Sequence, residues 1–140
     1  SPIELESRYE VYSEQYILSI EVEAKLVIEM AKSSIYPAAM QYLSELSATN
    51  AGVSAMGIKL DSTIAETIAT QADAMISTVQ KLSAALEKHD FASTEEHMQF
   101  CAKEILVLMS DIRANADALE GEVSDDLWPL PKYREMLFIK

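Results

Sequence analysis

Apolar and small residues recur every three or four positions along the first part of the chain, which predicts a long amphipathic helix. The stripe comprises Leu5, Tyr9, Tyr12, Tyr16, Ile20, Ala24, Val27, Ala31 and Ile35. Ser1 suits the N-cap, because Pro2 stands at the first helical position and Glu4 completes a capping box. Pro37 lacks a backbone donor and crowds the carbonyl four residues earlier, so we expect a kink or a restart there. A second helical stretch should then run to about Ala48.

Residues 47–61 gather Asn50, Gly52, Ser54 and Gly57, which favour turns, and this segment is predicted to be the main connection. Asp61 then offers an N-cap for the next helix. That helix carries an almost regular heptad pattern. Its apolar positions are Ile64, Ile68, Ala72, Met75, Val79, Leu82 and Leu86.

A third apolar stripe follows a second capping box, formed by Ser93 and Glu96. It comprises Met98, Cys101 or Ala102, Ile105, Leu108, Ile112, Ala116, Leu119 and Val123. Gly121 or the acidic segment 124–126 should end this helix. Helices with one apolar stripe must bury it against one another. We therefore predict an all-α fold, an elongated antiparallel helical bundle with a long, Pro-kinked first helix and a Pro-rich C-terminal tail.

The composition fits one helical domain over residues 1–140, with residues 127–140 as a docking tail. Hydrophobic residues make up 49% of the 140 residues and charged ones 24%, whereas three Gly and four Pro are few for a sandwich or barrel. The net charge of −12 argues against nucleic acid or an anionic membrane as a partner. A single Cys excludes an internal disulfide framework and favours the cytoplasm.

The candidate chemical groups do not combine into a site. A di-iron bundle needs Glu three residues before His, but Leu86 precedes His89 and Thr94 precedes His97 at that spacing. The glutamates of the first helix are typical of a solvated face, and no glycine-rich phosphate loop occurs. Cys101 lies in or beside an apolar stripe, which disfavours its thiolate. We predict no catalytic, cofactor-binding or metal residue.

Three tyrosines of the first stripe, Tyr9, Tyr12 and Tyr16, admit two interpretations. They could stack on bases or on a flat ligand, as aromatic side chains do in single-stranded nucleic-acid sites. They could instead line a helix seam while their hydroxyls reach water. The acidity of the chain favours the seam.

The tail, DDLWPLPKYREMLFIK, is bulky and apolar, and Pro129 and Pro131 restrict the backbone before it docks. It could cap its own bundle, or it could dock on another domain or subunit. The interface predicted for the second case comprises Trp128, Pro129, Leu130, Pro131, Tyr133, Arg134, Met136, Leu137 and Phe138.

Two segments resemble the C-terminal region of type III glutamine synthetases, which are glutamate–ammonia ligases. Residues 127–138, LWPLPKYREMLF, are similar to the C-terminal signature of this family. Residues 23–42, EAKLVIEMAKSSIYPAAMQY, are similar to a family helix in which a Pro-Ala step, here Pro37 and Ala38, follows an aliphatic run. Residues 47–94 carry no diagnostic motif.

The resemblance implies a parent enzyme that joins ammonia to glutamate with ATP and Mg or Mn ions, through a γ-glutamyl phosphate, in a dodecamer of two hexameric rings. Its catalytic residues lie in a preceding region, so none is assigned here. The chain is then a fragment that supports the parent's stability or assembly, and Ser1 is expected to be a cut within a longer protein. A free-standing helical sensory or adaptor bundle, suggested by the heptad helix, is the alternative.

Overall fold

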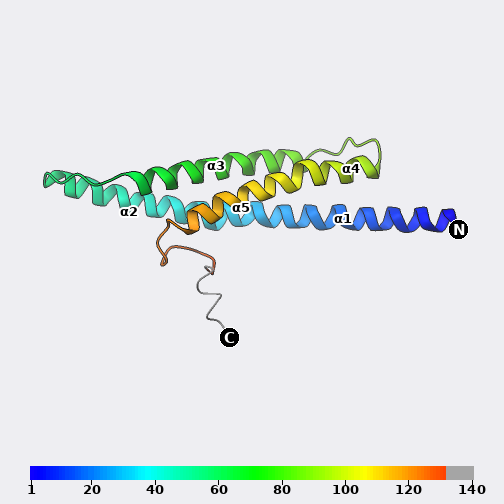
Figure 1. The fold of residues 1–140 in the computed structure, drawn as a ribbon, viewed down its shortest axis with the longest axis horizontal. Coiled ribbons are helices and arrows are strands. Elements are labelled where there is room, and N and C mark those ends of the chain that lie inside the picture. Colours follow the sequence, from blue (N-terminus) through cyan, green and yellow to red (C-terminus); the bar gives the residue numbers. More distant parts are fainter. Residues whose placement is uncertain (132–140) are drawn as a thin grey trace, which may run out of the picture.

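The computed structural model describes residues 1–131, and this part of the chain is helical between its connections and contains no strand. Figure 1 shows how the helices are arranged. In chain order they are α1 (Pro2–Met30), the π-helical turn η1 (Ala31–Ile35), α2 (Tyr36–Ala55), α3 (Thr63–Leu86), α4 (Thr94–Phe100), the π-helical turn η2 (Cys101–Ile105) and α5 (Leu106–Glu120). The predicted all-α class is confirmed.

One continuous helical rod, formed by α1, η1 and α2, runs along the whole length of the molecule (Figure 1). Helix α3 turns back along the rod, and α4, η2 and α5 then run in the opposite direction to α3. The most extensive helix–helix contact joins α3 to α5, and the next joins α2 to α3. The predicted elongated bundle of antiparallel helices is therefore present.

The expected kink or restart at Pro37 is not confirmed, because the helix continues through this residue. A π-helical turn stands immediately before the proline, and in it the N–H of Tyr36 donates to the carbonyl of Ala31, five residues earlier. Single π turns insert one extra residue into a helix. The widened turn lies where the proline ring would otherwise crowd the carbonyl of Ser33, so the rod passes Pro37 without breaking.

The predicted connection over residues 47–61 is too long, since α2 continues beyond Ala48 and ends at Ala55. The helix ends where Gly57 adopts a φ of +82°. The N–H of Ile58 donates to the carbonyl of Val53 at 2.9 Å, and that of Gly57 to Ser54 at 3.0 Å. These two bonds form a Schellman motif, which favours glycine at its left-handed position.

The helix starts follow the predicted caps at two of three places. Ser1 Oγ accepts from the N–H of Glu4, and Ser93 Oγ accepts from that of Glu96. The prediction of Asp61 as the N-cap of α3 is wrong by one residue, because Ser62 occupies that position. Asp61 lies just before it and accepts the N–H of Thr63 at 2.8 Å.

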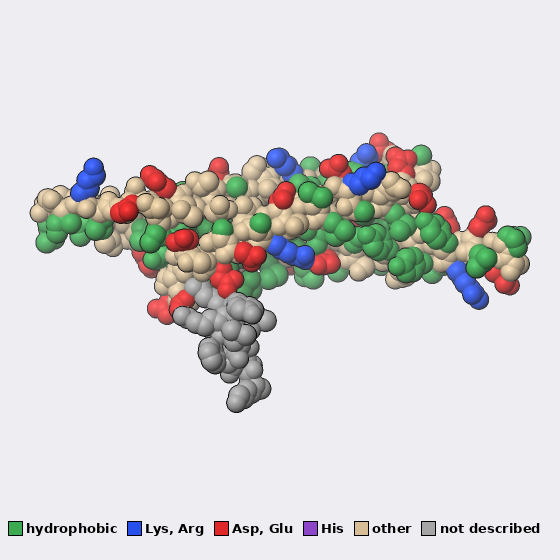
Figure 2. All heavy atoms as spheres, viewed as in Figure 1, with side chains coloured by type: hydrophobic (Ala, Val, Ile, Leu, Met, Phe, Trp, Pro, Cys, Tyr) green, Lys and Arg blue, Asp and Glu red, His purple; other side chains and the backbone are tan. Residues whose placement is uncertain are grey.

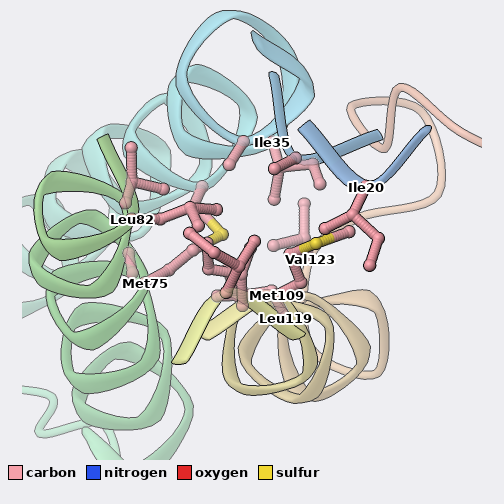
Figure 3. Close-up of a cluster of buried hydrophobic side chains, with 14 of the residues drawn as sticks. Ile20, Ile35, Met75, Leu82, Met109, Leu119 and Val123 are labelled. Carbon is pink, nitrogen blue, oxygen red and sulfur yellow. The ribbon is translucent and has the colours of Figure 1, made fainter. Parts of the chain in front are cut away.

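A single hydrophobic core lies where α3 and α5 pack against α1 and η1, and its side chains point toward one another in Figure 3. Helix α3 buries its predicted seam from Ile68 to Leu82. In the last stripe the buried residue is Cys101, not Ala102, and Met109 is buried where Leu108 was expected. Among residues 1–131, the buried polar residue is Ser13, whose hydroxyl donates to the carbonyl of Tyr9 at 2.8 Å.

No helix between residues 1 and 131 combines the length and the apolarity that a membrane span requires.

Leu82 should be essential to this core. We expect Leu82→Ala to lower the free energy of unfolding by about 2–5 kcal/mol, because it leaves a cavity where the side chain is fully buried. The matched control is Leu18→Ala on α1, whose side chain is 56% exposed, and it should cost less than about 0.5 kcal/mol. Urea denaturation measures both, and equal losses would contradict the assignment of the core.

Candidate functional site

The histidines do not gather with other ligands. Within residues 1–131 there is no group of three or more His, Cys, Asp or Glu residues that could hold a metal ion. His97 stacks on Phe91 with 4.1 Å between ring centroids and an interplanar angle of 11°. His89 is exposed, and both histidines line a surface depression of about 420 Å³ between α1 and the α3–α4 connection. Such stacking gives His97 a packing role.

Cys101 is buried, with 1% of its surface exposed. Burial raises the pKa of its thiol, and the nearby carboxylate of Glu21 raises it further. Both effects disfavour the thiolate, which is the reactive form of cysteine. The prediction that Cys101 behaves as a small apolar residue is confirmed.

The expected tyrosine seam is wrong for two of its three members. Tyr16 is half-buried against the core, but Tyr9 and Tyr12 are exposed, because α1 extends there beyond the helices that cover it (Figure 1). The hydroxyl of Tyr9 donates to Glu95 Oε2 at 2.8 Å, and this hydrogen bond to a carboxylate raises the pKa of Tyr9. The contact ties the α4 region to α1.

The described part of the tail folds back on the bundle. Trp128 is 8% exposed and belongs to the hydrophobic core, and Leu130 packs against that core while remaining half-buried. A turn starts this segment, because Ser124 O accepts the N–H groups of Leu127 and Trp128, each at 3.1 Å. The prolines at 129 and 131 are exposed. The first residues of the tail therefore cap their own bundle.

The rest of the predicted interface, Tyr133, Arg134, Met136, Leu137 and Phe138, lies outside the described residues. Its docking on another domain or subunit stays a prediction.

The buried indole of Trp128 has an unusual feature. Its Nε1 is buried and has no hydrogen-bond partner, the one side-chain nitrogen or oxygen in this condition among residues 1–131. A buried N–H without an acceptor costs free energy, typically about 1–3 kcal/mol. The ring is therefore held by its apolar contacts, against an electrostatic cost.

A second apolar surface lies on α1, and of its members the apolar periodicity predicted only Leu5, Tyr9 and Tyr12. Large hydrophobic side chains are exposed along most of the helix, and Figure 2 shows hydrophobic atoms over its middle and its projecting end. This α1 outer surface consists of Ile3, Leu5, Tyr9, Val11, Tyr12, Leu18, Val22, Leu26 and Met30. The four-residue spacing from Leu18 to Met30 was the signal that could have revealed it, because it marks a stripe separate from the buried one.

The charged residues of α1, which border this surface, are mostly acidic. Helix α1 contains seven glutamates but only one arginine and one lysine, Arg8 and Lys25. Glu23 pairs with Arg113 of α5 at 2.6 Å, and both side chains are about half exposed, so the pair contributes little to stability. An apolar surface within an acidic border fits a partner with an apolar face and a basic border.

Comparison with known proteins gives a consistent result. The family described as "Glutamine synthetase C-terminal domain" matches residues 1–54, which comprise α1, η1 and most of α2. "Type-3 glutamine synthetase" of Dictyostelium discoideum is 28% identical over 100% of the chain. "Glutamine synthetase" of Bacteroides fragilis is 29% identical over 98% of it. The chain spans 20% of the length of each of these two relatives.

The resemblance inferred from the two quoted segments is thus confirmed, and it extends through the middle of the chain, where no motif was diagnostic. Residues 1–54 are similar to the C-terminal domain of glutamine synthetases, and nearly the whole chain is similar to part of two glutamine synthetases, one of which is described as type 3.

Two substitutions at Trp128 separate its packing from its unpaired N–H. We expect Trp128→Ala to destabilise the fold by about 3–5 kcal/mol, as removal of a buried aromatic side chain does. Trp128→Phe should cost less than half as much, because it keeps a buried ring and removes the donor without a partner. Urea denaturation of the 140-residue chain measures both. Equal losses would show that Nε1 has a partner, and no loss in either would show that the tail is not packed.

Cys101 should make stability depend on alkaline pH. Because folding raises the thiol pKa above its ordinary value of 9.0, its contribution is complete below pH 9.0 and is lost as pH rises through the folded pKa. We expect the free energy of unfolding to fall more steeply above pH 9.0 in the native chain than in Cys101→Ala. The two proteins differ at position 101 alone, so parallel pH curves would contradict the raised thiol pKa.

Proposed function

We propose that this chain is the non-catalytic, helical C-terminal module of a type III glutamine synthetase, and that it supports the structure and assembly of its parent. The parent would join ammonia to glutamate with hydrolysis of ATP. The observation that carries this proposal is the similarity of nearly the whole chain to two glutamine synthetases of which it spans only 20%. A segment of this size fits one module of a larger chain.

The interior of the bundle supports a structural role. Its buried residues are almost all apolar, and Ser13, which is polar, uses its hydroxyl for a bond to its own helix. Such an interior holds helices together and offers no polar groups to a substrate. ATP and Mg or Mn ions are accordingly proposed to bind in the remainder of the parent, which would reside in the cytoplasm.

The α1 outer surface supports docking on that remainder. Contiguous exposed hydrophobic side chains mark interaction surfaces, and here they run along a helix that the rest of the bundle leaves open. The proposed occupant is the catalytic region of the parent or of a neighbouring subunit in its dodecamer, through a face with a basic border. The four fifths of the relatives' length outside this chain provide the surface for such a contact.

The tail adds a second connection. Trp128 anchors it to the bundle, and Pro129 and Pro131 restrict the backbone beyond this anchor. Tyr133, Arg134, Met136, Leu137 and Phe138 are proposed to contact the catalytic region or a neighbouring subunit. Restriction before docking lowers the entropy lost on binding.

Two truncations of the full-length parent test this role. Ending the chain after Pro131 keeps the anchor, so we expect the bundle to stay folded while the dodecamer dissociates more readily. Deleting residues 127–140 should in addition lower the thermal stability of the bundle, because it removes Trp128 and Leu130 from the core. Native mass spectrometry and thermal denaturation measure the two effects. An unchanged dodecamer with unchanged stability after both truncations would contradict the assembly role.

A further inference from the structure

At one end of the bundle only two helices, α2 and α3, lie side by side, and no third helix packs on them within residues 1–131. At this end the two helices extend beyond α5 as a hairpin (Figure 1). Ala39 on α2 and Ile68 on α3 are completely buried, yet no residue between them, from 40 to 67, is buried. We name residues 40–67 the α2–α3 tip. Two helices alone enclose little apolar surface, so such a hairpin gains stability when another element packs on it.

The tip presents an apolar groove. A groove of about 450 Å³ runs between α2 and the start of α3. Its polar lining includes Asp61, and its apolar lining comes from Leu43, Leu46, Leu60, Ile64 and Ala65. Met56 and Ile58, in the connection between the helices, are 75% and 47% exposed. The tip therefore offers both an apolar groove and protruding apolar side chains.

Charge distinguishes the tip from the rest of the chain. No Asp, Glu, Lys or Arg occurs from Leu46 to Ile58, although 24% of all residues are charged. The whole chain carries a net charge of −12, so two copies repel each other over most orientations. The charged residues of the tip are Glu45, Lys59, Asp61 and Glu66, on either side of this segment. Contact through residues 46–58 keeps most of the charge of the two copies far apart.

We propose that two copies of this chain associate through their α2–α3 tips. In this arrangement each hairpin supplies the layer that the other lacks, and two pairs of helices form a four-helix bundle about a two-fold axis. The groove of one copy receives apolar side chains of the other tip, and the reverse contact follows from the symmetry. The contact goes beyond the proposed function, because it joins this chain to its own copy and not to a catalytic region.

A second copy fits the tip better than the partner proposed for α1. The α1 outer surface has an acidic border, which selects a partner of opposite charge. The segment from Leu46 to Ile58 carries no charge, so it does not select a partner of opposite charge. The same uncharged segment of a second copy matches it in polarity, and a two-fold axis brings the two segments together.

Sedimentation equilibrium of the 140-residue chain tests the contact. We expect a monomer–dimer equilibrium whose Kd increases at least tenfold in Ile64→Glu, because the substitution places a charge in the apolar groove of both copies. Ile64 is 49% exposed, so folding should be unaffected, which circular dichroism can check. The matched control is Val11→Glu on α1, with 57% exposure, which should leave the Kd unchanged. Added salt should tighten the dimer, because it screens the repulsion between two acidic copies.

A cross-link locates the interface independently. Ser54→Cys places a thiol on the tip, while the native Cys101 is buried and does not compete for a reagent. A short bismaleimide should join two Ser54→Cys copies, whereas Glu10→Cys on α1 should give no product. A monomeric chain, a dimer insensitive to Ile64→Glu, or cross-linking through position 10 alone would overturn the proposal. Such a failure leaves the proposed function standing, because the truncations are measured on the assembly of the parent.

Discussion

The unequal lengths of the helices decide which parts of the structure are covered and where its core lies. The rod of α1, η1 and α2 covers residues 2–55 and is about 80 Å long at 1.5 Å per residue, whereas α3, with 24 residues, is about 36 Å long. Two shorter helical segments cannot cover the rod along its full length. The core therefore occupies the middle, where Leu82 of α3 and Met109 of α5 meet α1 and η1. The uncovered ends are where the molecule can contact other surfaces.

The two uncovered ends of the bundle, the projecting end of α1 and the α2–α3 tip, differ in their surface charge. The projecting end of α1 places exposed apolar side chains within an acidic border, which suits a partner of different composition. The α2–α3 tip is uncharged between Leu46 and Ile58, which suits contact between like-charged copies. Both surfaces share the same physical origin, since each is an apolar face that no helix of residues 1–131 reaches. Under the two proposals, α1 would contact the catalytic region of a parent enzyme, and the α2–α3 tip would contact a second copy of the chain.

Local rules predicted most helix boundaries and failed at Pro37, at the end of α2 and, by one residue, at the N-cap of α3. Two kinds of feature depend only on residues close together in the chain, so the sequence predicts them without the tertiary structure. They are the helix caps at Ser1 and Ser93 and the apolar seam of α3 from Ile68 to Leu82. Pro37 was expected to interrupt a regular α-helix, but the π turn before it shifts the hydrogen bonding. Gly52 was assigned to a connection, whereas the Schellman motif at Gly57 ends the helix. The sequence offers Asn50, Gly52 and Gly57 here, and only the backbone geometry selects one of them.

The sequence by itself determined the all-α class, the periodicity of the helices and the similarity to type III glutamine synthetases. Only the tertiary structure decided which apolar faces are buried. Tyr9 and Tyr12 continue the same stripe as Ile20 and Ala24, yet they are exposed, and Trp128 is buried although chain ends usually fray. The physical reason is that periodicity identifies the apolar side of a helix, while burial requires another segment to reach that side.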